Sequence, residues 1–209
     1  LFYFNYRSNI YNAIDPENDP DLKPAEVTEL KHQQYPSHRM TGILVDNAVD
    51  LVTKVIPKHG FETYRTALLA AQKNCVAMGI TTVSDAGLMK DEIDAITKLH
   101  ESGELKMRIY AMLSDSAPNY AWYFKKGPFK TARLNVCSFK FYADGALGSR
   151  GACLLRPYTD KPKEIGFLLN TRQHFETQFA ACLQHGFQVN AHCIGDSANR
   201  LIIDLYSQL

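Results

Sequence analysis

Between residues 61 and 209, apolar residues at helical spacing are followed by a glycine and then by a short apolar strand, three times over. The predicted helices are Glu62–Met78, Asp91–His100 and Thr171–His185. The predicted strands after them are Ile80–Val83, Lys106–Leu113 and Phe187–His192. A fourth strand is predicted at Leu134–Tyr142, and a last helix begins near Asp196. Such alternation predicts an α/β fold of parallel βαβ units, either an open doubly wound sheet or a barrel.

Residues 1–60 lack this regularity. The stretch Asp15–Asp21 is rich in proline and acidic residues, which predicts a loop. A short helix is predicted within Thr41–Val55 and ends before Pro57. We therefore divide the chain into an irregular N-terminal segment, residues 1–60 with loops and short helices, and a region of βα units, residues 61–209.

The composition is that of an ordinary globular protein. Hydrophobic residues make up 45% and charged residues 22%, and 23 basic against 22 acidic side chains give a formal net charge of +1. These values exclude intrinsic disorder and a basic nucleic-acid-binding tail. No apolar run reaches the roughly 18 to 20 residues that a membrane span needs. Because the chain begins at Leu1 rather than Met, we expect a processed start or a piece of a longer protein.

The cysteines are odd in number and show no CxxC or zinc-ribbon spacing. They are Cys75, Cys137, Cys153, Cys182 and Cys193. Several fall within apolar periodic segments, where a free cysteine packs as a small hydrophobic side chain. We predict reduced structural thiols, which favours a reducing compartment such as the cytoplasm without assigning one.

Two predicted strands carry a polar face that ends in a group able to act at a metal. The polar faces hold Ser138, Lys140 and Tyr142 on one strand, and Gln188, Asn190 and His192 on the other; Cys137, Phe139 and Phe141 form an apolar face. A lysine near the end of a sheltered strand is costly unless it is paired, neutralised or chemically engaged. As alternatives, Lys140 lies on an edge strand or pairs with Asp144, and His192 is an ordinary core or surface histidine. Because ligands gather at the carboxyl ends of strands in α/β enzymes, we favour a functional role for both residues.

The loop after Tyr142 is long, and in a (β/α)8 barrel a loop in this position helps to form the active site. Its glycines in Asp144–Gly151 do not have the GxGxxG or P-loop spacing, so we interpret them as a flexible substrate-side loop. Arg150 either binds a substrate carboxylate or lies on the surface. Asp85 is interpreted as a cap after its strand.

The remaining histidines show no His-x-His or His-x-x-x-His ligand spacing. His174 and His185, on or at the end of a predicted helix, are expected to face solvent. No Gly-x-Ser-x-Gly elbow supports serine-hydrolase chemistry. No residue is assigned as catalytic.

The segment Ser138–Arg150 resembles the lysine strand of the metal-dependent amidohydrolases, specifically the amidohydrolase 3 group of that superfamily. Ala191–Ala198 is similar to the histidine strand that follows it, and Thr41–Leu44 and Gly79–Gly87 fit the upstream pattern in the right order. The likeness covers roughly residues 40–209. It implies a (β/α)8 barrel with a small β-sandwich built from the chain ends. This chain would be a central piece, about four of the eight strands.

By this resemblance, Lys140 is carboxylated and His192 is a metal ligand. A neutral lysine amine captures CO₂ as a carbamate, an oxygen ligand that lysine itself lacks. The implied cofactor is zinc or another divalent metal, one or two ions, which acidifies a bound water and polarises a carbonyl. The implied function is hydrolysis of a non-peptide amide or related carbon–nitrogen bond in a small-molecule substrate. Asp144 and Arg150 are the candidates for binding that substrate.

The chain departs from the family pattern at three points. No His-x-His precedes residue 40, and neither a later histidine strand nor a late aspartate follows His192. Two ligands are too few for a closed zinc site, so we expect this chain alone to be inactive. The alternative function is a non-catalytic amidohydrolase-like module that binds a ligand or a partner. An unrelated doubly wound binding protein is disfavoured by the lack of a phosphate loop. An open sheet exposes strand edges, so we expect homo-oligomerisation or poor solubility.

Overall fold

The computed structural model describes residues 49–53 and 55–209. The chain divides into two compact units, Leu1–Ile56 and Pro57–Leu209. In the first unit the described part holds the short helix α2 (Asp50–Thr53), which falls within the helix predicted for Thr41–Val55. The loop predicted at Asp15–Asp21, the family-like segment Thr41–Leu44, and His32 and His38 lie outside the described residues. The domain boundary placed at residue 60 stays a prediction.

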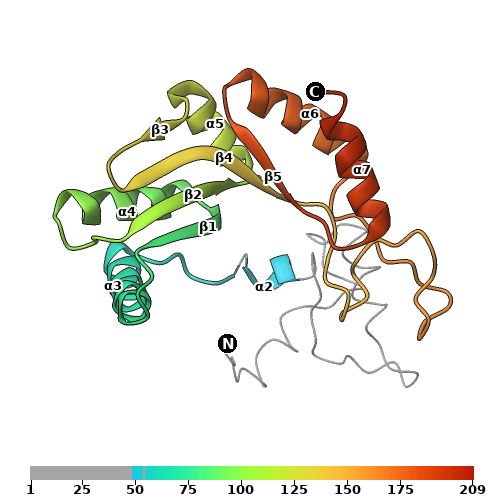
Figure 1. Cartoon of the computed structure of the whole chain (residues 1–209), viewed down its shortest axis with the longest axis horizontal. Helices are drawn as coiled ribbons and strands as arrows, with labels where there is room; N and C mark the ends of the chain where they lie inside the picture. The colour runs from blue at the N-terminus through green and yellow to red at the C-terminus, as the bar shows by residue number, and fades with distance from the viewer. Residues whose placement is uncertain (1–48, 54) are drawn as a thin grey trace. The chain divides into compact units, whose positions relative to one another are not determined.

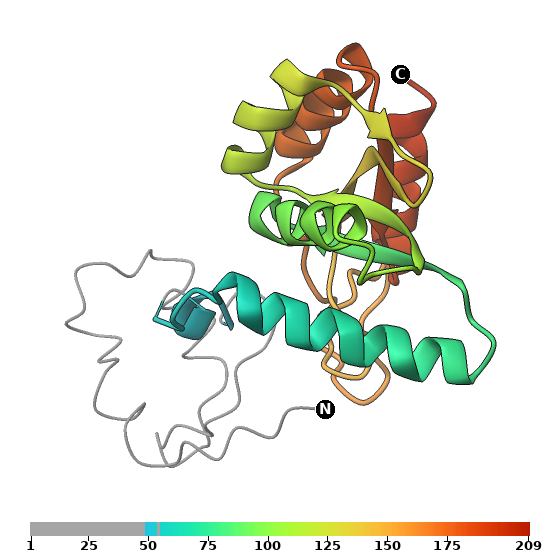
Figure 2. The same cartoon turned by 90° about the vertical axis from the view of Figure 1, so that its left-hand side faces the viewer.

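The second unit is a curved, mostly parallel sheet with helices along its outer face (Figures 1 and 2). In chain order its elements are α3 (Phe61–Ala77), β1 (Thr82–Leu88), α4 (Lys90–Glu101), β2 (Arg108–Ser114), α5 (Ala117–Lys126), β3 (Phe129–Lys130), β4 (Leu134–Tyr142), α6 (Arg172–Gln184), β5 (Gln188–His192) and α7 (Asp196–Tyr206). Strands β1, β2, β4 and β5 pair in parallel in that order, and the short β3 pairs antiparallel with the start of β4. Within the described residues, β1 and β5 therefore end the parallel sheet. The homo-oligomerisation expected from such open edges stays a prediction.

The repeated order of helix, glycine and strand has a structural cause at the helix ends. Gly79 adopts φ 77° after α3, and the N–H of Ile80 reaches back to the carbonyl of Cys75 at 2.9 Å. Gly186 repeats this turn after α6 with φ 80°. Glycine tolerates this left-handed conformation without a Cβ clash, so each helix stops and the chain enters the next strand at once. The predicted helix stops are confirmed.

Strand β1 is longer and starts later than the predicted strand Ile80–Val83. It runs to Leu88 because it pairs with β2 throughout, with a bulge between Ala86 and Leu88. Asp85 thus lies in the middle of β1, opposite Ala111, and is exposed. Its interpretation as a cap after the strand is wrong, because pairing with β2 overrides the local turn signal.

A second irregularity changes the faces of β4. The register shifts so that Ala111 lies opposite Val136 and the next residue, Met112, opposite Ser138, which leaves Cys137 as the extra residue. Val136 and Phe139 are both fully buried as a result, although they are three positions apart. Cys137 was predicted to share one apolar face with Phe139. That placement is wrong because strict alternation cannot anticipate a bulge.

The core lies between the sheet and helices α4 to α7, and aromatic side chains fill much of it. Phe139 has no exposed surface, and its ring centroid lies 5.0 Å from that of Tyr120 and 5.1 Å from that of Phe187. Further along β4, Phe141 packs against Phe179 with centroids 4.9 Å apart. These contacts join β4 to α5, to α6 and to Phe187, the residue before β5, in one cluster.

The cysteine side chains can be compared with the prediction of reduced structural thiols. All five cysteines are free, as predicted. Cys182 is the fully buried one, and burial raises the pKa of its thiol to about 12, which suits an inert packing role. Among residues 49–53 and 55–209 there is no helix with the length and apolar character of a membrane span.

His100, in the last turn of α4, is partly buried against the start of β2. Its Nε2 donates to the carbonyl oxygen of Met107 at 3.0 Å, and its buried Nδ1 has no partner within the described part of the chain. Burial lowers the pKa of His100 below its usual 6.5, and the positive charge of Arg133 adds to this effect. The folded state therefore favours the neutral imidazole.

We expect the free energy of unfolding to fall as the pH drops below 6.5. Unfolded His100 takes up a proton near that pH, whereas folded His100 does so only at lower pH, so the unfolded state binds more protons in between. The loss per pH unit stays below about 1.4 kcal/mol because a single imidazole binds at most one proton. Urea unfolding of wild type and His100→Gln above and below this window measures it. Equal pH slopes for the two proteins, with exposed His185→Gln as the control, would contradict the assignment.

Candidate metal centre

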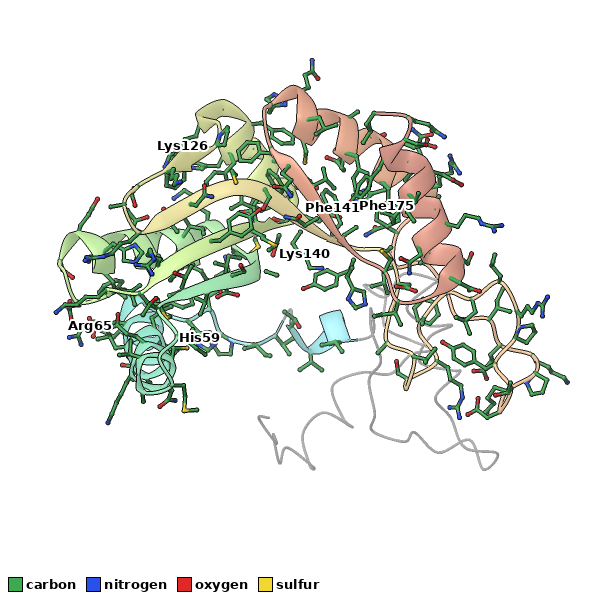
Figure 3. The ribbon with its side chains drawn as sticks, viewed as in Figure 1. His59, Arg65, Lys126, Lys140, Phe141 and Phe175 are labelled. Atoms are coloured by element: carbon green, nitrogen blue, oxygen red, sulfur yellow. The ribbon has the colours of Figure 1, made fainter. Side chains whose placement is uncertain are left out.

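Lys140 and His192 lie on neighbouring parallel strands, near their carboxyl ends. In the register of β4 and β5, Lys140 is opposite Asn190 and Tyr142 is opposite His192, so the two candidate ligands are two positions apart on one face. Figure 3 shows Lys140 on the face of β4 away from Phe141. Because β4 pairs with β2 on one side and with β5 on the other, the alternative that Lys140 lies on an edge strand is wrong.

Burial shifts Lys140 toward its neutral amine, whereas its contacts with an aromatic ring and a carbonyl oxygen also suit the ammonium form. Its Nζ lies 4.4 Å from the ring centroid of Tyr142 and 3.4 Å from the carbonyl oxygen of Phe141. Burial lowers the pKa of Lys140, and the nearby Cys193 thiol opposes this shift. Pairing with Asp144, the second alternative, is not found between these two described residues, because the Asp144 carboxylate binds backbone N–H groups instead. Only a neutral amine adds to CO₂, so the lowered pKa of Lys140 suits carbamate formation.

Tyr142 borders both candidate ligands. It was predicted to lie on the polar face of its strand, but no role was predicted for it. Its ring centroid lies 5.6 Å from that of His192, and its side chain is 43% exposed. Its hydroxyl reaches toward the β1 bulge, where a Cβ on Gly87 would lie 3.5 Å from that oxygen. The phenol thus borders both candidate ligands and extends across the sheet. Its place in the alternation with Lys140 was the signal that could have identified it.

A hydrogen-bonded polar layer lies below the candidate ligands on the same face of the sheet. The Tyr110 hydroxyl donates to Ser138 Oγ at 2.7 Å, and Asn190 Nδ2 donates to the Tyr110 oxygen at 3.3 Å. Gln188 Nε2 donates to Asn190 Oδ1 at 3.1 Å, which extends the network along β5. These bonds satisfy the polar groups that alternation predicted on this face. The side chains that lie below Lys140 on the sheet are therefore polar rather than apolar.

The donor set fits part of a metal site. An imidazole nitrogen and a carbamate oxygen are donor types that zinc accepts, and Lys140 and His192 supply them from adjacent strands. No group of three or more His, Cys, Asp or Glu side chains with ligand geometry occurs in residues 49–53 and 55–209. A metal-binding role for Lys140 and His192 stays a prediction.

Asp144, a candidate for the substrate side, points into the protein. Its side chain is 1% exposed. Oδ2 accepts the N–H groups of Cys153 and Gly195, both at 2.8 Å, and Oδ1 accepts that of Ile194 at 2.9 Å. All three of these partners are backbone groups. A role for Asp144 in binding substrate stays a prediction.

Arg150 is held within the long loop. Its guanidinium pairs with Asp160 at 2.7 Å, which raises the pKa of Arg150 and lowers that of Asp160. Arg150 also has φ 62°, a left-handed conformation that costs free energy in a residue with a Cβ. Its buried Nε has no partner among the described residues. The loop thus fixes the Arg150 side chain, whose contact with a substrate stays a prediction.

The prediction that His174 faces solvent is wrong. Its Nε2 lies 2.7 Å from Asp115 Oδ2, and the Tyr120 hydroxyl donates to the other oxygen of Asp115 at 2.6 Å. This cluster joins the end of β2 to α5 and α6. No sequence signal pointed to it, because its partners are far apart in the chain. His185 is exposed as expected, although its ring stacks on Phe124 at 4.2 Å.

Comparisons with known proteins agree with one another. A model of the amidohydrolase family matches residues 31–208. The chain is 30% identical over 192 residues to the protein LONG AFTER FAR-RED 3 of Arabidopsis thaliana, a match that covers 84% of this chain and 32% of that protein. It is 29% identical over 171 residues to the putative amidohydrolase YtcJ of Bacillus subtilis, covering 78% of this chain and 32% of that protein. The chain spans about a third of the length of these curated relatives.

Two solved structures share the fold. An uncharacterized metal-dependent hydrolase from Pyrococcus furiosus matches with a TM-score of 0.71 at 26% identity, over 89% of this chain and 40% of that one. Its counterpart from Pyrococcus horikoshii OT3 matches with a TM-score of 0.70 at 26% identity, over 86% of this chain and 38% of that one. The predicted α/β fold with parallel strands is confirmed, and these likenesses are consistent with a partial (β/α)8 barrel.

Proposed function

Because this chain belongs to the amidohydrolase family, as its sequence resemblance predicted, we propose that it carries part of the metal site of a hydrolase acting on carbon–nitrogen bonds. The substrate would be a small molecule with a non-peptide amide or a related bond. The observation that carries the proposal is the position of Lys140 and His192, two positions apart on one face of neighbouring parallel strands. Groups at the carboxyl ends of barrel strands are those that a substrate reaches.

Each described residue has a distinct part in this proposal. Lys140, as a carbamate, and His192 would hold a divalent metal, with zinc favoured by the donor types. When bound, such a metal acidifies a water and polarises the scissile carbonyl. Tyr142 borders both ligands and presents a hydroxyl that can donate to a substrate oxygen. Arg150, oriented by Asp160, offers a positive charge to a substrate carboxylate.

A non-catalytic module that binds a ligand or a partner is the second candidate. It is favoured by the described donor set, since Lys140 and His192 alone make an open pair rather than a closed site. The two candidates differ in metal content. A hydrolase of this family would hold one or two divalent ions per chain, whereas the binding module needs none.

We expect His192→Asn to weaken divalent metal binding by more than about 100-fold, because it removes a nitrogen ligand that no described neighbour replaces. Cobalt(II) titration of the full-length protein that contains this chain, followed by visible absorption and by metal analysis, measures the change. His185→Asn removes an exposed histidine and serves as the matched control. Equal cobalt affinity of His192→Asn and wild type would overturn the metal site. A wild-type protein that binds no metal would favour the non-catalytic module.

A further inference from the structure

The long loop after β4 returns to the turn that follows His192. The N–H of Ala143 donates to the carbonyl oxygen of His192 at 2.8 Å, which continues the pairing of β4 and β5 past both strands. Immediately afterwards, the Asp144 carboxylate accepts the N–H groups of Ile194 and Gly195. The same carboxylate accepts the N–H of Cys153 from the far side of the loop. One buried side chain thus joins the loop to the backbone behind His192.

The contact between loop and turn leaves no free space. A Cβ on Gly195 would lie 1.9 Å from the carbonyl oxygen of Cys153, so only glycine fits there. That carbonyl also accepts the N–H groups of Ser197 and Ala198, at 3.2 and 3.3 Å, at the start of α7. The N–H of Leu155 in turn donates to Asp196 Oδ1 at 2.8 Å. The loop segment therefore supplies hydrogen-bond partners that the first turn of α7 needs.

The bonds of Asp144 matter because β5 is weakly held in the described part of the chain. Its backbone pairs there only with β4, and His192 is its last residue. The orientation of a strand-end side chain follows its backbone, and the pairing of β4 with β5 ends at the hydrogen bond from Ala143 to the His192 carbonyl. The amides of Ile194 and Gly195, two and three positions after His192, are fixed by Asp144 instead. A carboxylate that accepts three backbone N–H groups while 1% exposed is committed to holding structure.

We propose that Asp144 is a positioning residue, which fixes the backbone behind His192 and so sets the imidazole relative to Lys140. It acts through His192, so this inference rests on the proposed function. Groups behind a metal ligand that fix its orientation typically change metal affinity by 10-fold to 100-fold when they are lost. Asp144 does this through backbone amides rather than through the imidazole itself.

Asp144→Asn tests the proposal in the full-length protein that contains this chain. The amide keeps one acceptor oxygen but turns an NH₂ group toward backbone donors. We expect cobalt(II) affinity to fall about 10-fold at a temperature where the variant is folded. In the metal-free protein, hydrogen exchange of the peptide containing Ile194 and Gly195 should become faster. Asp204→Asn, an exposed carboxylate on α7, is the matched control and should change neither quantity.

Gly195→Ala gives a second route to the same result, because it keeps the Asp144 carboxylate but its Cβ pushes away the Cys153 segment, whose N–H is one of the three partners of that carboxylate. It should also weaken cobalt binding and speed exchange around Ile194. Unchanged cobalt affinity in a folded Asp144→Asn or Gly195→Ala protein would overturn the positioning role, provided that His192→Asn abolishes binding. If His192→Asn also leaves binding unchanged, the metal site itself fails. Faster exchange with unchanged affinity would reduce Asp144 to a purely structural residue.

Discussion

If the proposed function is correct, replacing Lys140 with methionine in the full-length protein is expected to abolish hydrolysis and to lower its metal content. Methionine keeps the length of the chain but cannot add CO₂, so the carbamate oxygen is lost. Transition-state stabilisation by the metal is worth several kcal/mol, which corresponds to a fall in kcat/KM on the order of 10³-fold or more. Steady-state kinetics of the full-length protein measure the loss of hydrolysis. Metal analysis of each variant measures the loss of metal.

Two further proteins separate the carbamate from the charge of Lys140. Lys140→Arg keeps the positive charge, but the arginine guanidinium stays protonated and forms no carbamate. This variant should therefore be as inactive as the methionine variant. Lys163→Met removes an exposed lysine from the long loop and should behave like wild type. Carbon-13 bicarbonate should give a carbamate signal in wild type and none in either Lys140 variant. Full activity of Lys140→Arg would exclude the carbamate.

Phe139→Ala is expected to cause the largest loss of stability. The ring has no exposed surface and packs against Tyr120, Phe124 and Phe187 with centroids 5.0 to 5.6 Å apart. Truncating a buried phenylalanine costs about 3–5 kcal/mol, through lost burial and the cavity that remains. Chemical denaturation measured by circular dichroism gives the change in free energy of unfolding.

Ile203→Ala is the control for this effect, since Ile203 on α7 is 63% exposed. Its free energy of unfolding should change by no more than about 0.5 kcal/mol. A loss below about 1 kcal/mol for Phe139→Ala would contradict the packing of β4 against α5 and β5. A large loss confined to Phe139→Ala would support it.

The regular part of the fold was accessible from the sequence because its signals are local. The bounds of β4, Leu134–Tyr142, follow from alternation between turn signals, and the helices end where Gly79 and Gly186 permit a left-handed turn. The same alternation put Lys140 and His192 on polar faces. Parallel pairing then brings those faces side by side, as α/β topology requires.

The parts that were missed depend on contacts between distant residues. Helix α5 carries Pro118 near its start and mostly aromatic apolar residues, so no helix was predicted between Leu113 and Leu134. The bulge at Cys137 follows from pairing with β2 rather than from the β4 sequence. No spacing rule links residues as far apart as Asp115 and His174. Each of these features exists only once the sheet has formed.

The candidate site residues also differ in whether local sequence signals or contacts between distant residues place them. Tyr142 was within reach, because it alternates with Lys140 on one face of β4. The contacts of Asp144 with Ile194 and Gly195 were not, since the residues are 50 and 51 positions apart. A glycine-rich segment was interpreted as flexible because glycine is permissive. That segment was Asp144–Gly151, and its flexibility stays a prediction; a different glycine, Gly195, allows two backbones to approach closely.

The loop of residues 143–171 is bonded to the turn after His192 through Asp144 and Cys153. These contacts limit how the sequence of the loop can change among related proteins. If this loop were replaced by the loop of a relative, the new loop would need a carboxylate at position 144, and the protein would need a glycine at position 195. Residues outside these contacts, at the tip around Asp160, are constrained by the pair of Asp160 with Arg150 and can otherwise vary in length and charge. New substrate preferences would therefore arise at the tip of the loop, while its base is inherited together with the strand that ends in His192.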